Sequence, residues 1–270
     1  MFLTGISKNQ RKRPRGEFPW SMKLFRELKE LQFTAPVTFF VGENGSGKST
    51  FLEAVAIGVN AVAAGSADLN QDETLWASHE LARGFHFARK RRPARTMFLR
   101  AEDVMGYSMR AARLQREGRL LKEGGGRALE QLDEERIREE SEPRAGSPEQ
   151  MRERLLRKHD YDPGARSHGE TFLDLLAARL RPQGLYFLDE PETPLSPVRQ
   201  LSLLGLIMER AADDCQFIVA THSPILMALP DAQILLFDNG HIEPAAYEDV
   251  EHVKITRAFL NNPAKFLRHF

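Results

Sequence analysis

A glycine-rich segment, Gly42 to Thr50, constrains the fold of this chain more than any other feature. The apolar run 37–41 before it is typical of a strand buried on both faces. The run 49–63 is rich in Ala, Leu, Val and Ile and predicts a helix. The letters GENGSGKST fit the pattern G-x-x-x-x-G-K-[ST] in the strand, loop and helix context that this pattern requires. The alternative is a chance match in a flexible loop, and the flanking strand and helix argue against it.

The residue types in this loop suit the binding of phosphate groups. Glycines allow successive backbone N–H groups to converge on phosphate oxygens, and the following helix adds the positive end of its dipole. We expect Lys48 to reach the β and γ phosphates of ATP and the Ser49 hydroxyl to bind Mg²⁺. The residues expected to contact the nucleotide are Gly42, Glu43, Asn44, Gly45, Ser46, Gly47, Lys48, Ser49 and Thr50.

Two acidic residues end a second apolar run. Residues 185–188 predict a buried strand, and Asp189 and Glu190 follow it at the sheet edge where α/β folds place ligands. We expect Asp189 to hold Mg²⁺ through its water shell and Glu190 to accept a proton from the attacking water. An acidic pair can also simply end a strand. Its combination with Lys48 favours a catalytic role.

Two further polar segments are candidates for the same site. His222 directly follows the predicted strand Gln216–Ala220, where it could contact the γ phosphate and orient the water, although a lone histidine is more often structural. The segment SHGE contains Ser167, Gly169 and Glu170 and precedes a predicted helix over 171–180. Taken alone, SHGE is an ordinary helix N-cap with an acid three residues later.

The alternation of strands and helices predicts an α/β fold with a mostly parallel central sheet and right-handed crossovers. Buried strands are expected at residues 37–41, 97–99, 185–188, 216–220 and 234–237. A helix is expected over 198–212, and Asn239-Gly240 is typical of a hairpin turn after the last strand.

Residues 106–166 differ in composition from the rest of the chain, because they are crowded with Arg and Glu and contain few large apolar side chains. We interpret them as an insertion, either a solvated helical arm or a nucleic-acid surface. With the SHGE segment and its helix, they form an inserted helical subdomain over 106–180 within a single domain of residues 1–270.

The composition gives little indication of a partner. Lys plus Arg and Asp plus Glu are 38 each, so no overall charge indicates nucleic acid. The single cysteine, Cys215, excludes an intramolecular disulfide, and the start of the chain has no signal-peptide core. We therefore expect a cytoplasmic protein. No apolar run approaches the roughly 18 residues of a membrane helix, so we expect no direct membrane insertion.

The order of these motifs resembles that of ABC-type ATPase domains over nearly the whole chain. GENGSGKST is similar to their Walker A motif, LYFLDE to their Walker B motif and His222 to their switch histidine. SHGE stands where their signature motif is expected. The resemblance implies Mg²⁺-dependent ATP hydrolysis by an ATP-dependent homodimer. Two copies would enclose two ATP molecules, with Ser167 and Gly169 of one copy facing Lys48 of the other.

Other segments are similar to one branch of that family. DEPE at 189–192, LSP at 195–197 and THSP at 221–224 resemble the soluble branch that contains SMC, RecF-like and OLD-like ATPases. The resemblance is closest to small stand-alone bacterial ATPases of the AAA family.

Two features depart from the family pattern. No glutamine follows the strand 97–99, where the family has a ligand for magnesium, and Arg100 or Glu102 are candidates for part of that role. Phe18 and Trp20 are candidates for stacking on adenine, and packing in the core is the alternative for both.

The sequence is compatible with three functions. The first is an ATP-driven clamp that acts on DNA or on a DNA-processing protein, in DNA repair or defence; basic clusters at 89–92, 110–113 and 152–158 support it. The second is the nucleotide-binding subunit of an ABC transporter, against which the atypical signature and the missing glutamine argue. The third is a regulatory ATP sensor for a protein partner, against which Glu190 argues.

Overall fold

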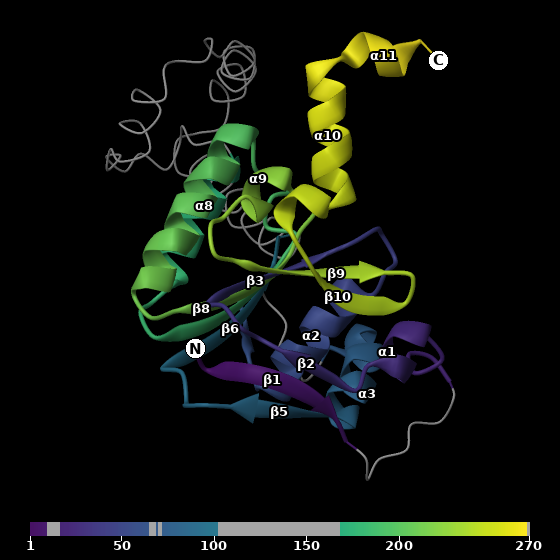
Figure 1. Ribbon diagram of the computed structural model, residues 1–270. Helices are drawn as coiled ribbons and strands as arrows, with labels where there is room; N and C mark the ends of the chain where they lie inside the picture. The colour runs from purple at the N-terminus through teal and green to yellow at the C-terminus, as the bar shows by residue number, and fades with distance from the viewer. Residues whose placement is uncertain (10–16, 65–68, 70–71, 102–167, 269–270) are drawn as a thin grey trace, which may run out of the picture.

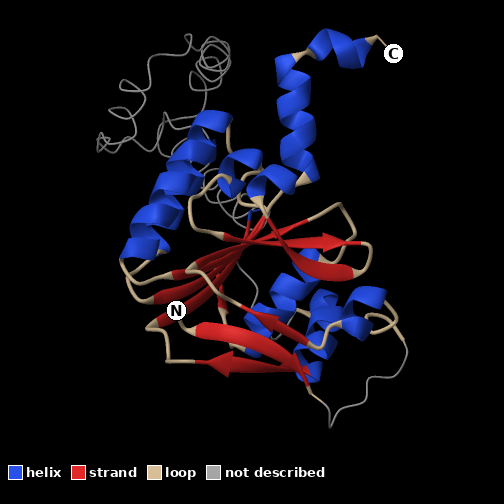
Figure 2. Cartoon of the chain, in the orientation of Figure 1, coloured by secondary structure: helices blue, strands red, loops and turns tan. Residues whose placement is uncertain are grey.

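The computed structural model describes residues 1–9, 17–64, 69, 72–101 and 168–268. Within these residues the chain forms two β-sheets, and helices cover both faces of the larger sheet (Figure 1, Figure 2). None of the helices in this part of the chain is long and apolar enough to cross a membrane.

The larger sheet has seven strands in the order β10-β9-β3-β8-β7-β6-β4. All neighbours are parallel except β9 and β10, which form an antiparallel pair. The strands are β3 (Val37–Val41), β4 (Val62–Ala63), β6 (Arg95–Arg100), β7 (Gly184–Asp189), β8 (Gln216–Ala220), β9 (Gln233–Asp238) and β10 (His241–Ala245). The five expected strands and the mostly parallel α/β sheet are thus confirmed.

A smaller antiparallel sheet of three strands lies below the larger one in Figure 1. Its order is β2-β1-β5, with β1 (Leu3–Lys8), β2 (Glu30–Gln32) and β5 (Phe85–Arg89). These three strands are not predictable from the sequence pattern, because polar and charged residues interrupt their apolar positions.

Two groups of helices lie on opposite sides of the larger sheet (Figure 1). On the side of the smaller sheet are α1 (Lys23–Glu27), α2 (Lys48–Gly58), η1 (Glu73–Leu75) and α3 (Trp76–Gly84). The remaining helices are α7 (His168–Arg179), α8 (Pro197–Ala212), α9 (Pro224–Met227), η2 (Tyr247–Asp249), α10 (Glu251–Asn261) and α11 (Pro263–Leu267). Of these, α8, α9 and α10 lie on the other side of the sheet, and α10 extends outward to the C-terminus.

Strand β3 shows how the central sheet is buried on both faces. Phe40 packs on the side of α2, with ring centroids 5.8 Å from Phe51 and 5.0 Å from Phe237. Phe39 points to the other face and belongs to the core that contains Leu203 of α8. Because adjacent side chains of a strand alternate between faces, a continuous apolar run is what such a strand requires.

Two expectations about helices need correction or comment. The helix expected over 49–63 ends at Gly58, because Asn60 adopts a left-handed φ of 58° and Val62 pairs with Met97 in the edge strand β4. The helix expected over 171–180 corresponds to α7, which begins earlier, at His168. The insertion expected at 106–166 lies outside the described residues.

The turn expected at Asn239-Gly240 is confirmed. It joins β9 to β10, and both residues have positive φ values, 49° and 79°. Asn and Gly are the residues that tolerate this conformation in two-residue hairpins.

Candidate nucleotide-binding site

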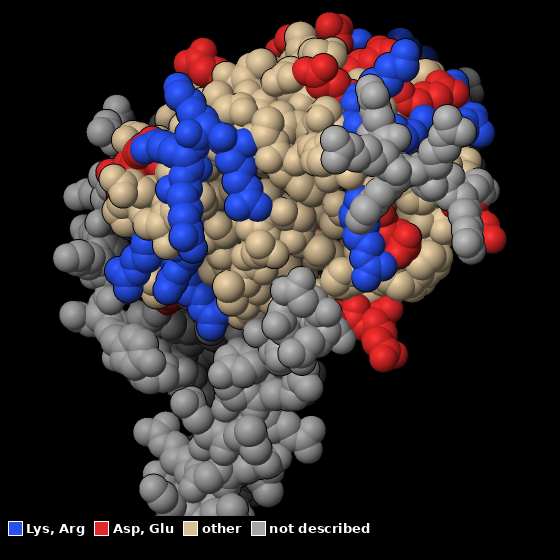
Figure 3. Space-filling model, turned by 90° about the horizontal axis from the view of Figure 1, so that it is seen from below, with Lys and Arg blue, Asp and Glu red and all other residues tan. Residues whose placement is uncertain are grey.

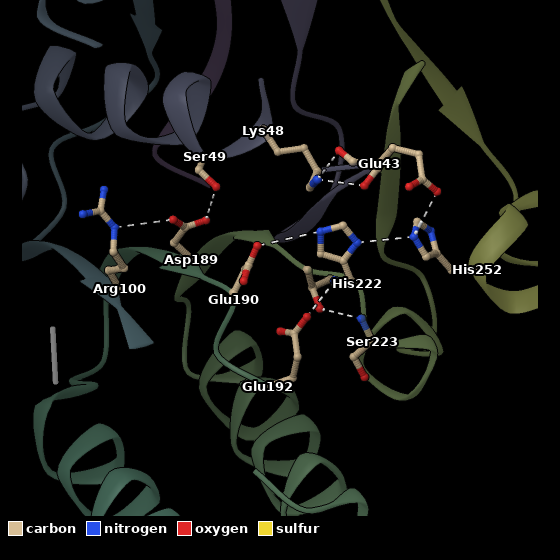
Figure 4. A network of polar contacts seen from close by, with 12 residues as sticks. Glu43, Lys48, Ser49, Arg100, Asp189, Glu190, Glu192, His222, Ser223 and His252 are labelled. Carbon is tan, nitrogen blue, oxygen red and sulfur yellow. Dashed lines mark hydrogen bonds and ion pairs between the residues drawn. The ribbon is translucent and has the colours of Figure 1, made fainter. Parts of the chain in front are cut away.

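Three loops meet at one edge of the larger sheet because their strands β3, β8 and β7 are neighbours. Asp189 at the end of β7 is in register with Ala220 at the end of β8. The next residue, Thr221, donates its backbone N–H to the carbonyl of Phe40 at 3.1 Å. The expected residues Lys48, Ser49, Asp189, Glu190 and His222 therefore lie together, as Figure 4 shows.

The glycine-rich loop has a shape that other residues would not allow. Gly42 and Gly47 have φ values of 152° and 97°. A Cβ atom on Gly42 would lie 2.3 Å from the carbonyl oxygen of Phe237, so the close approach of these segments requires glycine.

Lys48 begins helix α2, and its ammonium group lies inside the loop. The Nζ atom donates to the carbonyls of Gly42 and Glu43 at 2.7 and 2.9 Å. Burial lowers the pKa of Lys48, while the carboxylates of Glu190 and Asp189 act in the opposite direction. Lys48 thus places a positive charge beside the acidic end of β7.

Ser49 and Asp189 form the candidate magnesium site. The Ser49 hydroxyl donates to Oδ1 of Asp189 at 2.9 Å, and Asp189 is only 4% exposed. Burial raises the pKa of Asp189 to about 7, and the bond from Ser49 opposes this shift. Both side chains offer hard oxygen ligands, and Mg²⁺ prefers a few such ligands together with water and phosphate. Within the described residues, no cluster of three or more His, Cys, Asp or Glu could hold a metal ion by itself.

Arg100, at the end of β6, lies on the other side of Asp189. Its Nε atom is 3.7 Å from Oδ2 of Asp189, and its guanidinium also pairs with Glu53 of α2. A guanidinium has no lone pair for a metal, so Arg100 acts on Asp189 through its charge rather than as a ligand. Glu102, the other candidate for this role, lies outside the described residues.

Glu190 differs sharply from its neighbour Asp189. It has a positive φ of 46°, and its backbone N–H donates to the carbonyl of Ala220 at 2.9 Å. Its carboxylate is 42% exposed, and Oε1 lies 3.8 Å from Nε2 of His222. One acid is therefore buried beside Ser49 while the other faces solvent beside a histidine.

His222 is held from two sides. Its backbone N–H donates to Oε1 of Glu192 at 2.6 Å. Its Nδ1 atom lies 3.3 Å from Nε2 of His252, on α10, and His252 lies 3.6 Å from Oε1 of Glu43 (Figure 4). Burial lowers the pKa of His222, and the positive charge of Lys48 acts in the same direction.

Sequence reasoning gave no role to two members of this network. Glu192 belongs to the DEPE segment, where its burial beside His222 was not predicted; burial raises its pKa. His252 lies 30 residues after His222, and no local pattern connects the two.

Three side-chain atoms at this edge are buried and have no hydrogen-bond partner in the part of the chain that the structure describes. They are Oγ of Ser46, in the glycine-rich loop, Oε2 of Glu192 and Nε2 of His222. Buried polar atoms are normally hydrogen-bonded, and the Ser46 hydroxyl and the His222 ring can each donate to a phosphate oxygen, so these two atoms fit a site for phosphate groups.

Ser167 lies outside the described residues, and Gly169 and Glu170 are placed only as part of helix α7. Phe18 packs against Trp76 with ring centroids 5.5 Å apart, and Trp20 against Phe85 at 5.4 Å. Neither lines the hollow of about 370 Å³ beside the glycine-rich loop, and Phe18 is 49% exposed while Trp20 is 7% exposed.

Three parallel strands each end in a functional segment: a phosphate-binding loop after the first, an acidic pair after the second and a histidine after the third. This arrangement defines a P-loop ATPase domain with an ABC-type order of motifs. A family model described as "AAA domain" matches residues 21–157, which is 137 of the 270 residues. The chain belongs to this AAA domain family. A second model, described as "AAA domain, putative AbiEii toxin, Type IV TA system", matches residues 167–228.

Comparison with solved structures finds similar folds. The SMC head domain from Thermotoga maritima is 20% identical, with 91% of this chain and 100% of that chain covered and a TM-score of 0.48. An ATP-binding cassette of an ABC transporter in its ADP conformation is 17% identical, with 96% and 99% covered and a TM-score of 0.47. An Smc head domain derived from Pyrococcus furiosus is 14% identical, with 86% and 95% covered and a TM-score of 0.42. No curated protein matches the sequence.

Proposed function

We propose that this chain binds ATP with Mg²⁺ and hydrolyses it, and that ATP binding pairs two copies of the chain. The observation that carries the proposal is the convergence of Lys48, Asp189, Glu190 and His222 at one sheet edge. The family match supports the same assignment.

The surroundings of each site residue indicate its role in the proposed reaction. Lys48 and the backbone N–H groups of the loop would hold the phosphates. Magnesium, held by Ser49 and Asp189, would neutralise negative charge on the phosphate oxygens. Glu190 is exposed enough to meet a water molecule and would accept its proton, while His222 would orient that water through Nε2.

The pairing of two copies rests on the resemblance to ABC-type ATPases. In this arrangement Ser167 and Gly169 of one copy would complete the phosphate site around Lys48 of the other. The proposal favours turnover over a purely regulatory sensor, because Glu190 and His222 lie beside each other at the open side of the site.

ATP binding tests the first step. The variant Lys48→Ala should lose detectable ATP binding in a calorimetric titration, because Lys48 is the cation that the glycine-rich loop holds through the carbonyls of Gly42 and Glu43. Lys265→Ala, which removes an exposed lysine on α11, is the matched control and should bind ATP as the unmodified protein does. Equal ATP affinity for Lys48→Ala would contradict the assignment.

Pairing is tested separately. Glu190→Gln should form a dimer at saturating MgATP, measured by light scattering, because it binds ATP without turning it over. Adding Ser167→Arg should return the protein to a folded monomer. If Glu190→Gln binds ATP and stays monomeric, the pairing is wrong while the ATP site stands.

A further inference from the structure

A second hollow, of about 1090 Å³, lies away from the candidate nucleotide site and is strongly basic. No Asp or Glu lines it among the residues that the structure describes, although the whole chain has 38 acids and 38 bases. Its cationic residues are Arg89, Lys90, Arg91, Arg92, Arg95 and Arg179.

The strand register separates this hollow from the nucleotide site. On β6, Arg95 pairs with Gly184 at the start of β7, whereas Arg100 pairs with Asp189 at its end. Five residues of strand span roughly 17 Å, so the hollow lies at the opposite end of the sheet. Its occupant would not compete with ATP.

Half of the cations are fixed in place by other groups. Arg89 donates to the carbonyl of Gly58 at 3.0 Å, and Arg179 donates to the carbonyl of Ala64. Arg91 lies 4.3 Å from the ring centroid of Phe2 and pairs with Asp214. These contacts hold three guanidinium groups at the wall of the hollow.

The other three cations are available to a ligand. Lys90, Arg92 and Arg95 are exposed and make no hydrogen bond or ion pair through their side chains with any described residue. Lys90 and Arg92 lie in the segment that joins β5 to β6, and Arg95 is the first residue of β6. Figure 3 shows a group of Lys and Arg side chains at the left of this face of the molecule, and other Lys and Arg side chains beside Asp and Glu at the right.

We propose that this hollow binds single-stranded nucleic acid through its phosphates. Cationic side chains spaced along residues 89–95 match a linear chain of phosphate groups, and guanidinium pairs well with phosphate oxygens. The rest of the lining is largely apolar, including Val62, Pro93, Ala94 and Met97, and offers contact area to unpaired bases or sugars. The bases of a duplex are paired and stacked inside the helix, whereas the bases of a single strand are free to contact this apolar lining. The lining therefore favours a single strand.

The test measures fluorescence anisotropy of a labelled single-stranded oligonucleotide across a salt series, without ATP. The triple variant Lys90→Ser, Arg92→Ser and Arg95→Ser removes the available cations. The slope of log K against log salt is negative, and each lost phosphate contact makes it less steep by about 0.7. The slope of the triple variant should therefore be less steep by about 2. This corresponds to binding that is roughly a hundredfold weaker at about 0.1 M salt.

A matched variant separates this site from general charge. This control is a second triple variant, which removes the same charge from exposed positions outside the hollow: Lys29→Ser, Lys265→Ser and Arg268→Ser. It should bind the single strand as the unmodified protein does. Equal losses in the two triple variants would overturn the proposal, as would tighter binding of the matching duplex or of polyglutamate. ATP binding should be unchanged in both variants, so failure here leaves the proposed ATPase function untouched.

Discussion

At the scale of single residues, Asp189 and Glu190 show how neighbours acquire different chemistry. Asp189 is buried between Ser49 and Arg100, whereas Glu190 is nearly half exposed beside His222. The sequence predicts two acids at a strand end and two roles for them. Their different environments follow from the left-handed backbone of Glu190, which the sequence does not reveal.

The raised pKa of Asp189 predicts how stability depends on pH. Its pKa is about 7 in the folded state against 3.8 as the ordinary value, so the folded state holds this proton more tightly. The contribution of protonated Asp189 to the free energy of unfolding is therefore fully present below about pH 4 and is lost as the pH rises to about 7. Asp189→Asn does not titrate, so its melting temperature relative to the unmodified protein should rise across this pH range without magnesium. A difference that does not change with pH would contradict the burial argument.

His252 predicts a second effect at this scale. It contacts Nδ1 of His222, so removing it should let the ring of His222 turn away from Glu190. We expect His252→Ala to lower the turnover of ATP by roughly tenfold to a hundredfold, with ATP binding little changed. His241→Ala, a change at an exposed histidine of β10, is the control. Full turnover by His252→Ala would show that His222 does not need this support.

At the scale of elements, a buried side chain joins the two sheets. Gln216 of β8 is 0% exposed, and its Oε1 accepts from the N–H groups of Phe2 and Leu3 at 2.7 and 2.9 Å. Its Nε2 donates to the carbonyl of Leu3 at 2.8 Å. Gln216 therefore connects the central sheet to strand β1.

Gln216→Leu should leave these backbone groups buried without partners. We expect a loss of about 2–4 kcal/mol in the free energy of unfolding, measured by denaturant titration. Gln32→Leu, at an exposed position of β2, should change it by less than about 0.5 kcal/mol. Similar losses in the two variants would contradict the role of Gln216.

The central strands could be predicted from sequence, but the smaller sheet could not. Strands such as β7 and β8 are buried on both faces and therefore appear as continuous apolar runs. Strand β5 contains His86 and Arg89 among its apolar residues, since only one of its faces is covered. Its place in a sheet depends on pairing with β1, which is distant in sequence.

At the scale of the whole molecule, the fold places two charged regions at opposite ends of the larger sheet. The composition does not reveal them, because the acidic and basic residues of the chain are equal in number. The nucleotide site lies where parallel strands end, and the basic hollow lies where they begin. Residues 89–92 suggested a basic cluster from sequence alone, but Arg179 comes from a distant helix and joins them only in the fold. The Lys48 loop was predictable because its chemistry lies within one short segment. The contacts of His252 were not, because they depend on where α10 lies.

The hydrolysis of ATP tests the central claim most directly. Phosphate release at saturating MgATP should be measured for the unmodified protein and for Glu190→Gln, with ATP binding measured on the same preparations. The account predicts that Glu190→Gln binds ATP normally and releases phosphate at least about a hundredfold more slowly, because it lacks the proton acceptor. Equal rates of phosphate release by the two proteins would contradict it.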